Sequence, residues 1–147
     1  MWVKGTPLYF IVDSGSQKNL ISEKVVKQLG LSTTQHLQPY NIRYLRQEWD
    51  LCVSQQCWFS YGIQPFKDKV LCDVAPLDVY DVLLGQSYMR RRHVVYESRH
   101  RSVIVTFGGH LYRIPEVVPT IIPPKQCRKV VSHIAKSSFF TVYSKGE

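Results

Sequence analysis

The segment Leu8-Tyr9-Phe10-Ile11-Val12-Asp13-Ser14-Gly15-Ser16 decides how the rest of this chain is interpreted. Five consecutive apolar residues, rich in aromatic and β-branched side chains, predict a buried β-strand. A carboxylate directly after such a strand is costly to desolvate unless it has partners or a chemical use. Gly15 allows a tight turn in which a backbone N–H approaches that carboxylate. Asp13 is therefore a candidate functional acid, although Asp-Ser-Gly is also a common turn.

A second apolar strand ends in glycine far downstream, at Asp81-Val82-Leu83-Leu84-Gly85. A short helix is predicted directly after it, over residues 86–91. Two strands of this kind can pack side by side. The second strand would then support the loop that carries Asp13.

The order of the motifs resembles that of a known family. Tyr9 to Gly15, followed by Asn19-Leu20-Ile21-Ser22, is similar to the active-site segment of retropepsins, the aspartic proteases of retroviruses and LTR retrotransposons. The closest likeness is to the protease segment of plant gypsy-type retrotransposon polyproteins. Each motif is weak alone, but the ordered set, from about Val3 to Pro115, is fairly specific. The other pieces that fit are Gln28-Leu29-Gly30-Leu31, Tyr61-Gly62-Ile63, Phe66-Lys67-Asp68, Val70-Leu71-Cys72-Asp73-Val74 and Val82-Leu83-Leu84-Gly85.

The resemblance implies a mostly β structure, a retropepsin-like closed β-barrel or acid-protease fold with one or two short helices. It also implies an aspartic endopeptidase that cleaves polyprotein peptide bonds with a water held between two carboxylates. This chain has one Asp-Ser-Gly, and 147 residues are too few for a bilobal protease that carries both acids. We therefore expect a homodimer in which Asp13 of each copy meets at a two-fold axis.

The resemblance also assigns supporting roles. Ser14 is expected to send its hydroxyl across the axis to the backbone of the other loop, and Gly15 to offer its N–H to the carboxylate. Gly85 is expected to let the second loop pass close beneath the first. Substrate would bind as an added strand, with Ile42, Tyr44 and Leu84 lining pockets for apolar side chains.

Alternating apolar and polar residues between Gln38 and Ser60 predict a β-hairpin around a polar tip. In retropepsins the hairpin in this region is the flap that closes over the peptide. The likeness places its tip near Gln47, Glu48 and Trp49. Flap tips of the family usually contain glycine, and this chain has none between Arg46 and Cys57.

Composition indicates one globular domain, with 44% hydrophobic and 20% charged residues. The net charge of +8 permits an acidic partner, but the basic residues are dispersed apart from Arg90-Arg91-Arg92 and a loosely basic tail. We therefore do not expect a nucleic-acid partner for this domain. The four cysteines show no Cys-x-x-Cys spacing, and the histidines lie at no ligand spacing from them. We expect no metal, no cofactor and reduced thiols.

No signal-peptide h-region and no apolar stretch of membrane-spanning length occur, so we expect no membrane partner. The expected location is intracellular, in the cytoplasm or within a virus-like particle.

Residues 1–114 are expected to form the protease domain. Residues 115–147 are expected to form a Pro-rich linker and tail, similar to the joining segment that leads to a polymerase in such polyproteins.

Three alternatives remain at this point. One is a catalytically inactive retropepsin-like module for dimerisation or peptide binding. The second is a nucleic-acid-binding module, which would require Lys, Arg and aromatic side chains gathered on one face. The third is a β domain of a degenerate mobile element without activity.

Overall fold

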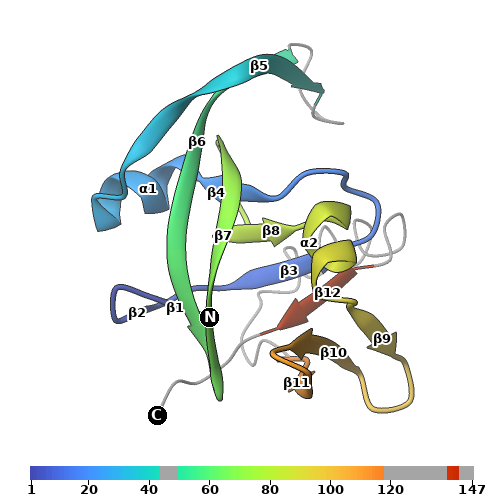
Figure 1. Ribbon diagram of the computed structural model, residues 1–147. Coiled ribbons are helices and arrows are strands. Elements are labelled where there is room, and N and C mark those ends of the chain that lie inside the picture. Colours follow the sequence, from blue (N-terminus) through green and yellow to red (C-terminus); the bar gives the residue numbers. More distant parts are fainter. Residues whose placement is uncertain (44–49, 118–138, 143–147) are drawn as a thin grey trace, which may run out of the picture.

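The computed structural model describes residues 1–43, 50–117 and 139–142 (Figure 1). Within these ranges the chain forms twelve strands and two short helices. The strands are β1 (Trp2–Val3), β2 (Thr6–Pro7), β3 (Phe10–Asp13), β4 (Leu20–Ser22), β5 (Thr33–Arg43), β6 (Asp50–Ile63), β7 (Phe66–Ala75), β8 (Val82–Leu84), β9 (Val95–Glu97), β10 (Ser102–Phe107), β11 (His110–Pro115) and β12 (Phe139–Val142). The helices are α1 (Glu23–Leu29) and α2 (Gln86–Arg91).

Most of these strands belong to one curled sheet, which forms half a barrel (Figure 1). Its order is β12-β3-β8-β4-β7-β6-β1-β2, and β5 pairs with β6. A second sheet of the described residues has the order β11-β10-β9. The predicted class, a mostly β acid-protease fold with short helices, is confirmed, with a half-barrel in place of a closed one.

For the first hairpin the sequence predicts a turn over Gly5-Thr6-Pro7, and the structure differs in detail. Thr6 and Pro7 are paired with β1, and the turn is Lys4-Gly5. Both turn residues have positive φ, +48° at Lys4 and +75° at Gly5. A two-residue loop of this kind matches the right-handed twist of the flanking strands, which explains the shorter turn.

The sequence predicts a helix that starts after Ser22 and ends at Gly30, and α1 has these bounds. Val25 and Val26 are its buried residues, and Gly30 ends it in the left-handed conformation with φ of +61°. Ser22 is at the N-cap position, but its side chain makes no capping hydrogen bond. Its hydroxyl donates instead to the carbonyl of Leu77 at 3.4 Å. Ser22 thus ties the start of the helix to the loop before β8.

Strand β12 lies in the segment expected to be a tail. Its backbone pairs antiparallel with β3, and Phe139 is opposite Asp13. These four residues therefore belong to the same sheet as the candidate acid. The boundary of the domain at residue 114 stays a prediction.

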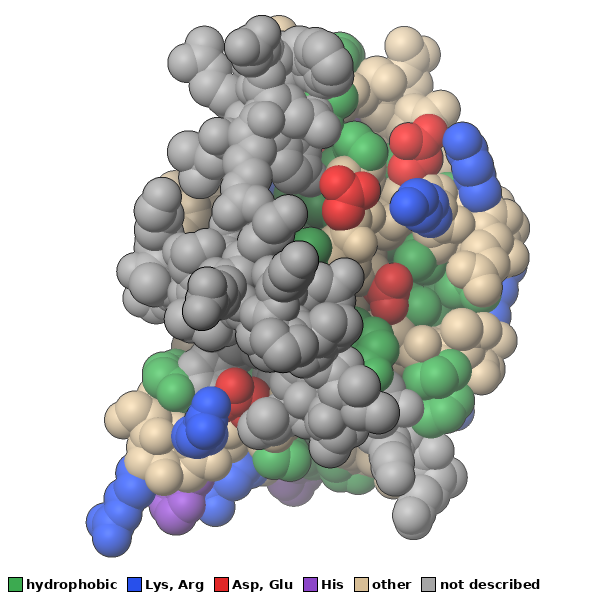
Figure 2. Space-filling model, turned by 180° about the vertical axis from the view of Figure 1, so that it is seen from behind, with side chains coloured by type: hydrophobic (Ala, Val, Ile, Leu, Met, Phe, Trp, Pro, Cys, Tyr) green, Lys and Arg blue, Asp and Glu red, His purple; other side chains and the backbone are tan. Residues whose placement is uncertain are grey.

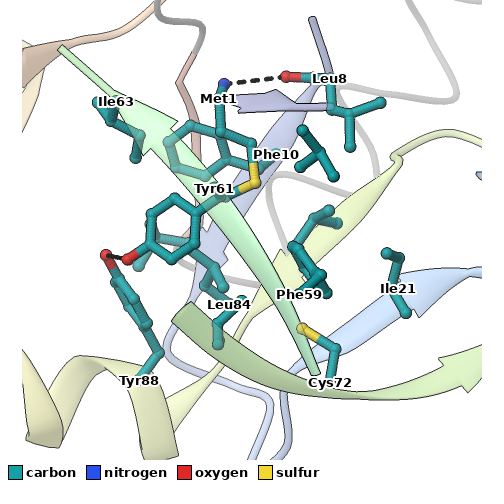
Figure 3. Close-up of a cluster of buried hydrophobic side chains, with 14 of the residues drawn as sticks. Met1, Leu8, Phe10, Ile21, Phe59, Tyr61, Ile63, Cys72, Leu84 and Tyr88 are labelled. Atoms are coloured by element: carbon teal, nitrogen blue, oxygen red, sulfur yellow. Dashed lines mark hydrogen bonds between the residues drawn. The ribbon is translucent and has the colours of Figure 1, made fainter. Parts of the chain in front are cut away.

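The main hydrophobic core lies against β3, β6, β7 and β8 (Figure 3). Phe10, Ile21 and Leu84 have 2% or less of their surface exposed. One polar network crosses this core. The hydroxyls of Tyr61 and Tyr88 are 2.9 Å apart, and Tyr61 donates to Asp68, which also accepts from Arg92 Nε at 2.8 Å. Each of these buried polar groups thereby has a partner.

Replacing Phe10 by alanine tests the core directly. Because Phe10 is 1% exposed, the variant leaves a cavity, and we expect the free energy of unfolding to fall by about 3–5 kcal/mol. Denaturant unfolding measures this change. Leu37→Ala, at a side chain that is 95% exposed, is the control and should change stability by less than about 0.5 kcal/mol. Equal effects of the two variants would contradict the assigned core.

The buried tyrosines predict a loss of stability at high pH. Burial raises the pKa of Tyr88 to about 12, and burial followed by the neighbouring Tyr88 also raises the pKa of Tyr61. Between pH 10 and 12 the unfolded chain loses phenolic protons that the folded chain keeps, so the free energy of unfolding falls as pH rises through this range. Unfolding in denaturant at successive pH values should show a shallower fall in Tyr88→Phe, by about 1.4 kcal/mol per pH unit. An unchanged slope would mean that Tyr88 ionises freely in the folded state.

Candidate active site

Strand pairing puts Asp13 and Gly85 at the same edge of the sheet. Strands β3 and β8 are parallel, with Phe10 opposite Val82 and Val12 opposite Leu84. The next residue on each strand is therefore Asp13 on one and Gly85 on the other. Asp13 is half-buried at this edge, and its Oδ1 accepts a 2.8 Å hydrogen bond from the Gly15 N–H. A carboxylate in this position is both fixed and reachable.

Gly85 lies directly beneath the loop that follows Asp13. A Cβ atom at this position would be 2.4 Å from the Lys18 carbonyl oxygen and 2.6 Å from that of Ser16. Backbone atoms cannot move aside as a flexible side chain can, so only glycine fits here. The close approach that the sequence suggested for this residue is present in the structure.

Four hydrogen bonds join the Asp13 loop to the start of α2. The Gly85 N–H donates to Asn19 Oδ1 at 2.9 Å, and the Gln86 N–H to the Ser16 carbonyl at 2.8 Å. The Ser87 N–H donates to the Gln17 carbonyl at 3.3 Å. The Gln86 side chain donates from Nε2 to the Ser14 carbonyl at 2.7 Å. The first amides of the helix, which have no intrahelical partner, thus stabilise the loop.

Sequence reasoning missed Asn19 and Gln86 as positioning residues. Both stand next to motifs that were recognised, Asn19 five residues after Ser14 and Gln86 directly after Gly85. The Asn19 side chain joins two segments, since its Oδ1 accepts from the Gly85 N–H and its Nδ2 donates to the Leu71 carbonyl of β7 at 3.3 Å. An amide side chain beside an Asp-Ser-Gly loop is a signal for this role, because it can donate and accept at once.

The hairpin of β5 and β6 arches over one side of the sheet (Figure 1). Ile42 on β5 packs against a small cluster of Leu20, Ala75 and Leu77, and Leu83 of β8 packs against the same cluster. Of the other residues expected to contact substrate, Tyr44, Gln47, Glu48 and Trp49 lie outside the described residues.

The expectation that Leu84 lines a substrate pocket does not fit its position. The Leu84 side chain is 0% exposed and points into the main core, as Figure 3 shows. Because successive side chains on a strand point to opposite faces, its neighbour Leu83 faces the small cluster beside Ile42. Leu83 is therefore the β8 residue on the side of Ile42, and its partly buried side chain does not belong to the main core.

Among the residues that the structure describes, no group of three His, Cys, Asp or Glu side chains could hold a metal ion.

On the face drawn in Figure 2, the acidic and basic side chains of the described part lie interspersed. No described helix has the length and apolar character of a membrane span.

The family model of the "gag-polyprotein putative aspartyl protease" matches residues 1–91. The chain belongs to this family. The matched region extends from β1 through α2, so it contains both the Asp13 loop and the Gly85 turn beneath it. The general kind of the protein, an aspartic protease-like domain, follows from this membership.

The fold is similar to that of one solved structure. The crystal structure of the retroviral protease-like domain of Ddi1 from Leishmania major has a TM-score of 0.57 with this chain at 14% sequence identity. The match covers 82% of this chain and 92% of that one. At this identity the likeness concerns the fold alone. No curated protein matches the sequence.

Replacing Gly85 by alanine should distort the loop that carries Asp13. Because the new Cβ would clash with two backbone carbonyls, we expect the free energy of unfolding to fall by about 1–3 kcal/mol. The amide signals of residues 14–19 should shift in NMR spectra. Gly62→Ala is the matched control, since a Cβ there would meet one side-chain atom at 4.0 Å. A Gly85→Ala chain with unchanged stability and loop signals would contradict the close approach.

Proposed function

We propose that this chain is an aspartic endopeptidase that acts as a homodimer on polyprotein substrates. One observation carries the proposal. A single acid, Asp13, follows a buried strand and is fixed by the Gly15 N–H above a glycine turn, in a chain with no second Asp-Ser-Gly. The resemblance to plant gypsy-type polyproteins supports a polyprotein as substrate.

The chemistry requires two carboxylates. One is ionised and takes a proton from water, and the other is protonated and donates to the carbonyl of the scissile bond. Two such groups at short distance titrate as a pair, because like charges oppose double ionisation. Asp13 supplies one group per chain, and Asp13 of a second copy would supply the other across a two-fold axis.

The supporting residues act on the position of the acid. The Gly15 N–H and the Gln86 side chain hold the loop from two sides. Ser14 would send its hydroxyl across the axis to the backbone of the second loop, which would keep the two carboxylates coplanar. Gly85 allows the supporting turn to lie in contact with the loop.

Substrate would lie in extended form between the dyad and the β5–β6 hairpins, which would act as flaps. Ile42 and Leu83 pack against one apolar cluster and are both partly buried, so they are the candidates for an apolar pocket. Tyr44 and the tip residues Gln47, Glu48 and Trp49 would contact the peptide from above. Backbone pairing along the peptide would give broad specificity for apolar residues.

The decisive variant is Asp13→Asn. It should lower kcat on an apolar peptide at acidic pH by roughly 10³-fold or more, because the remaining amide cannot activate water. The wild-type activity should be blocked by a statine-type inhibitor. Glu23→Gln on the exposed side of α1 is the control and should keep full activity. Cleavage by Asp13→Asn at the wild-type rate would exclude the proposed chemistry.

A mixing experiment tests the shared site. Adding an excess of Asp13→Asn chain to a fixed amount of wild type should suppress cleavage, because mixed dimers have one carboxylate in place of two. The same excess of a Glu23→Gln chain should not suppress it. Sedimentation at the assay concentration reports how much dimer is present. Activity that is proportional to the amount of wild-type chain and insensitive to the inactive chain would indicate a monomeric enzyme. Dimers that cleave no peptide would indicate a binding module.

A further inference from the structure

A buried carboxylate, that of Asp73 on β7, lies outside the proposed catalytic loop. Its side chain is 7% exposed, and its oxygens are reached by three donors. The Tyr40 hydroxyl donates to Oδ2, and Gln56 Nε2 donates to Oδ1 at 3.5 Å. His36 Nε2 is 3.4 Å from Oδ1. We name these four side chains the Asp73 cluster.

The donors come from the two arms of the β5–β6 hairpin. His36 and Tyr40 are on β5, and Gln56 is on β6. The pairing of β5 with β6 shifts register between Gln35 and Tyr40, where β5 bulges. In a regular strand, side chains four residues apart are too far apart to reach one carboxylate. The bulge brings His36 and Tyr40 together, with their rings in edge contact at 5.5 Å.

The proton positions in the cluster follow from its contacts. The Gln38 N–H donates to His36 Nδ1 at 2.9 Å, so Nδ1 is an acceptor and Nε2 carries the hydrogen that faces Asp73. Burial, and then the hydrogen bond to Asp73, raises the pKa of Tyr40, which keeps its hydroxyl protonated as a donor. The arrangement is one carboxylate with donors on both oxygens.

The backbone of Asp73 is joined to the Asp13 loop. The Asp73 N–H donates to the Asn19 carbonyl at 2.9 Å, and Asn19 Oδ1 accepts from the Gly85 N–H. Lys18, in the same loop, places its Nζ 5.7 Å from the centre of the Tyr40 ring. Asp73 therefore contacts the hairpin through its side chain and the candidate active site through its backbone.

We infer that the Asp73 cluster consists of positioning residues that fix the base of the β5–β6 hairpin relative to the Asp13 loop and thereby set the affinity for substrate. This inference rests on the proposed protease function. The cluster lies away from the reacting atoms, so it acts on how the hairpin meets the peptide and leaves the chemical step unchanged. Loss of one donor should weaken substrate binding more than turnover.

The chain contains a matched control for this role. Tyr61 also donates to an aspartate, Asp68, at 3.1 Å and is buried in the same sheet. Its hydroxyl contacts Tyr88 of α2 and Asp68 of β7, and its ring contacts Phe66 of β7. These contacts involve neither β5 nor the Asp13 loop. Tyr40→Phe and Tyr61→Phe thus each remove one tyrosine hydroxyl that donates to an aspartate.

Kinetics on the full chain separate positioning from a general loss of stability. Tyr40→Phe should raise KM for an apolar peptide roughly 5- to 10-fold with kcat nearly unchanged. Tyr61→Phe should leave KM at the wild-type value. His36→Gln, which keeps an N–H donor, should retain most of the affinity that His36→Ala loses. An equal rise of KM in Tyr40→Phe and Tyr61→Phe would overturn the inference.

Hydrogen exchange of the unliganded chain tests the anchor without any catalysis. The amides of residues 33–43 should exchange faster in Tyr40→Phe and at the wild-type rate in Tyr61→Phe. If no variant and no wild-type chain cleaves peptide, the protease proposal fails, while selective exchange in β5 still supports the anchor. If β5 exchanges at the wild-type rate in Tyr40→Phe, the anchoring role is wrong even for an active protease.

Discussion

Strands β3 and β8 pair in parallel, and this pairing brings the candidate acid next to the glycine turn. It aligns Val12 with Leu84, so that the acid and the glycine leave the sheet side by side. The loop after Asp13 then lies on Gly85, with carbonyls closer than any side chain would allow. The amides at the start of α2 and the side chain of Gln86 donate to the same loop. These contacts fix the half-buried carboxylate of Asp13 through hydrogen bonds from uncharged groups.

The core supplies the rigidity that this arrangement needs. Phe10 and Leu84 belong to the strands that bear the two loops, and both are buried in one cluster with β6 and β7 (Figure 3). Tyr61, Tyr88 and Asp68 add a polar network that joins α2 to the same sheet. Because protein interiors are close-packed, a shift of either strand would disturb the whole cluster. The position of the acid is therefore maintained from behind by apolar packing.

The β5–β6 hairpin is attached to the sheet by a different kind of contact. Its arms carry His36, Tyr40 and Gln56, which all reach the carboxylate of Asp73. Buried polar groups of this kind specify one geometry, because every alternative leaves a donor or acceptor unpaired. The apolar core thus packs beneath Asp13, and the Asp73 cluster joins the base of the hairpin to the sheet. Asn19 connects the two, since its backbone accepts from Asp73 and its side chain accepts from Gly85.

Local sequence determined the strand before Asp13, helix α1 with its terminal Gly30, helix α2 and the glycine beneath the acid. These features depend on short apolar runs, on the left-handed conformation at Gly30 and on a close backbone approach at Gly85 that only glycine allows. Tertiary structure alone decided that Leu84 faces the core and Leu83 the other side, because periodicity does not say which face of a short strand is buried. It also decided the bulge in β5 and the meeting of His36 and Tyr40 with Asp73, residues more than thirty positions apart in the chain. Contacts between distant segments depend on strand order and register, and these are set by the packing of the whole sheet.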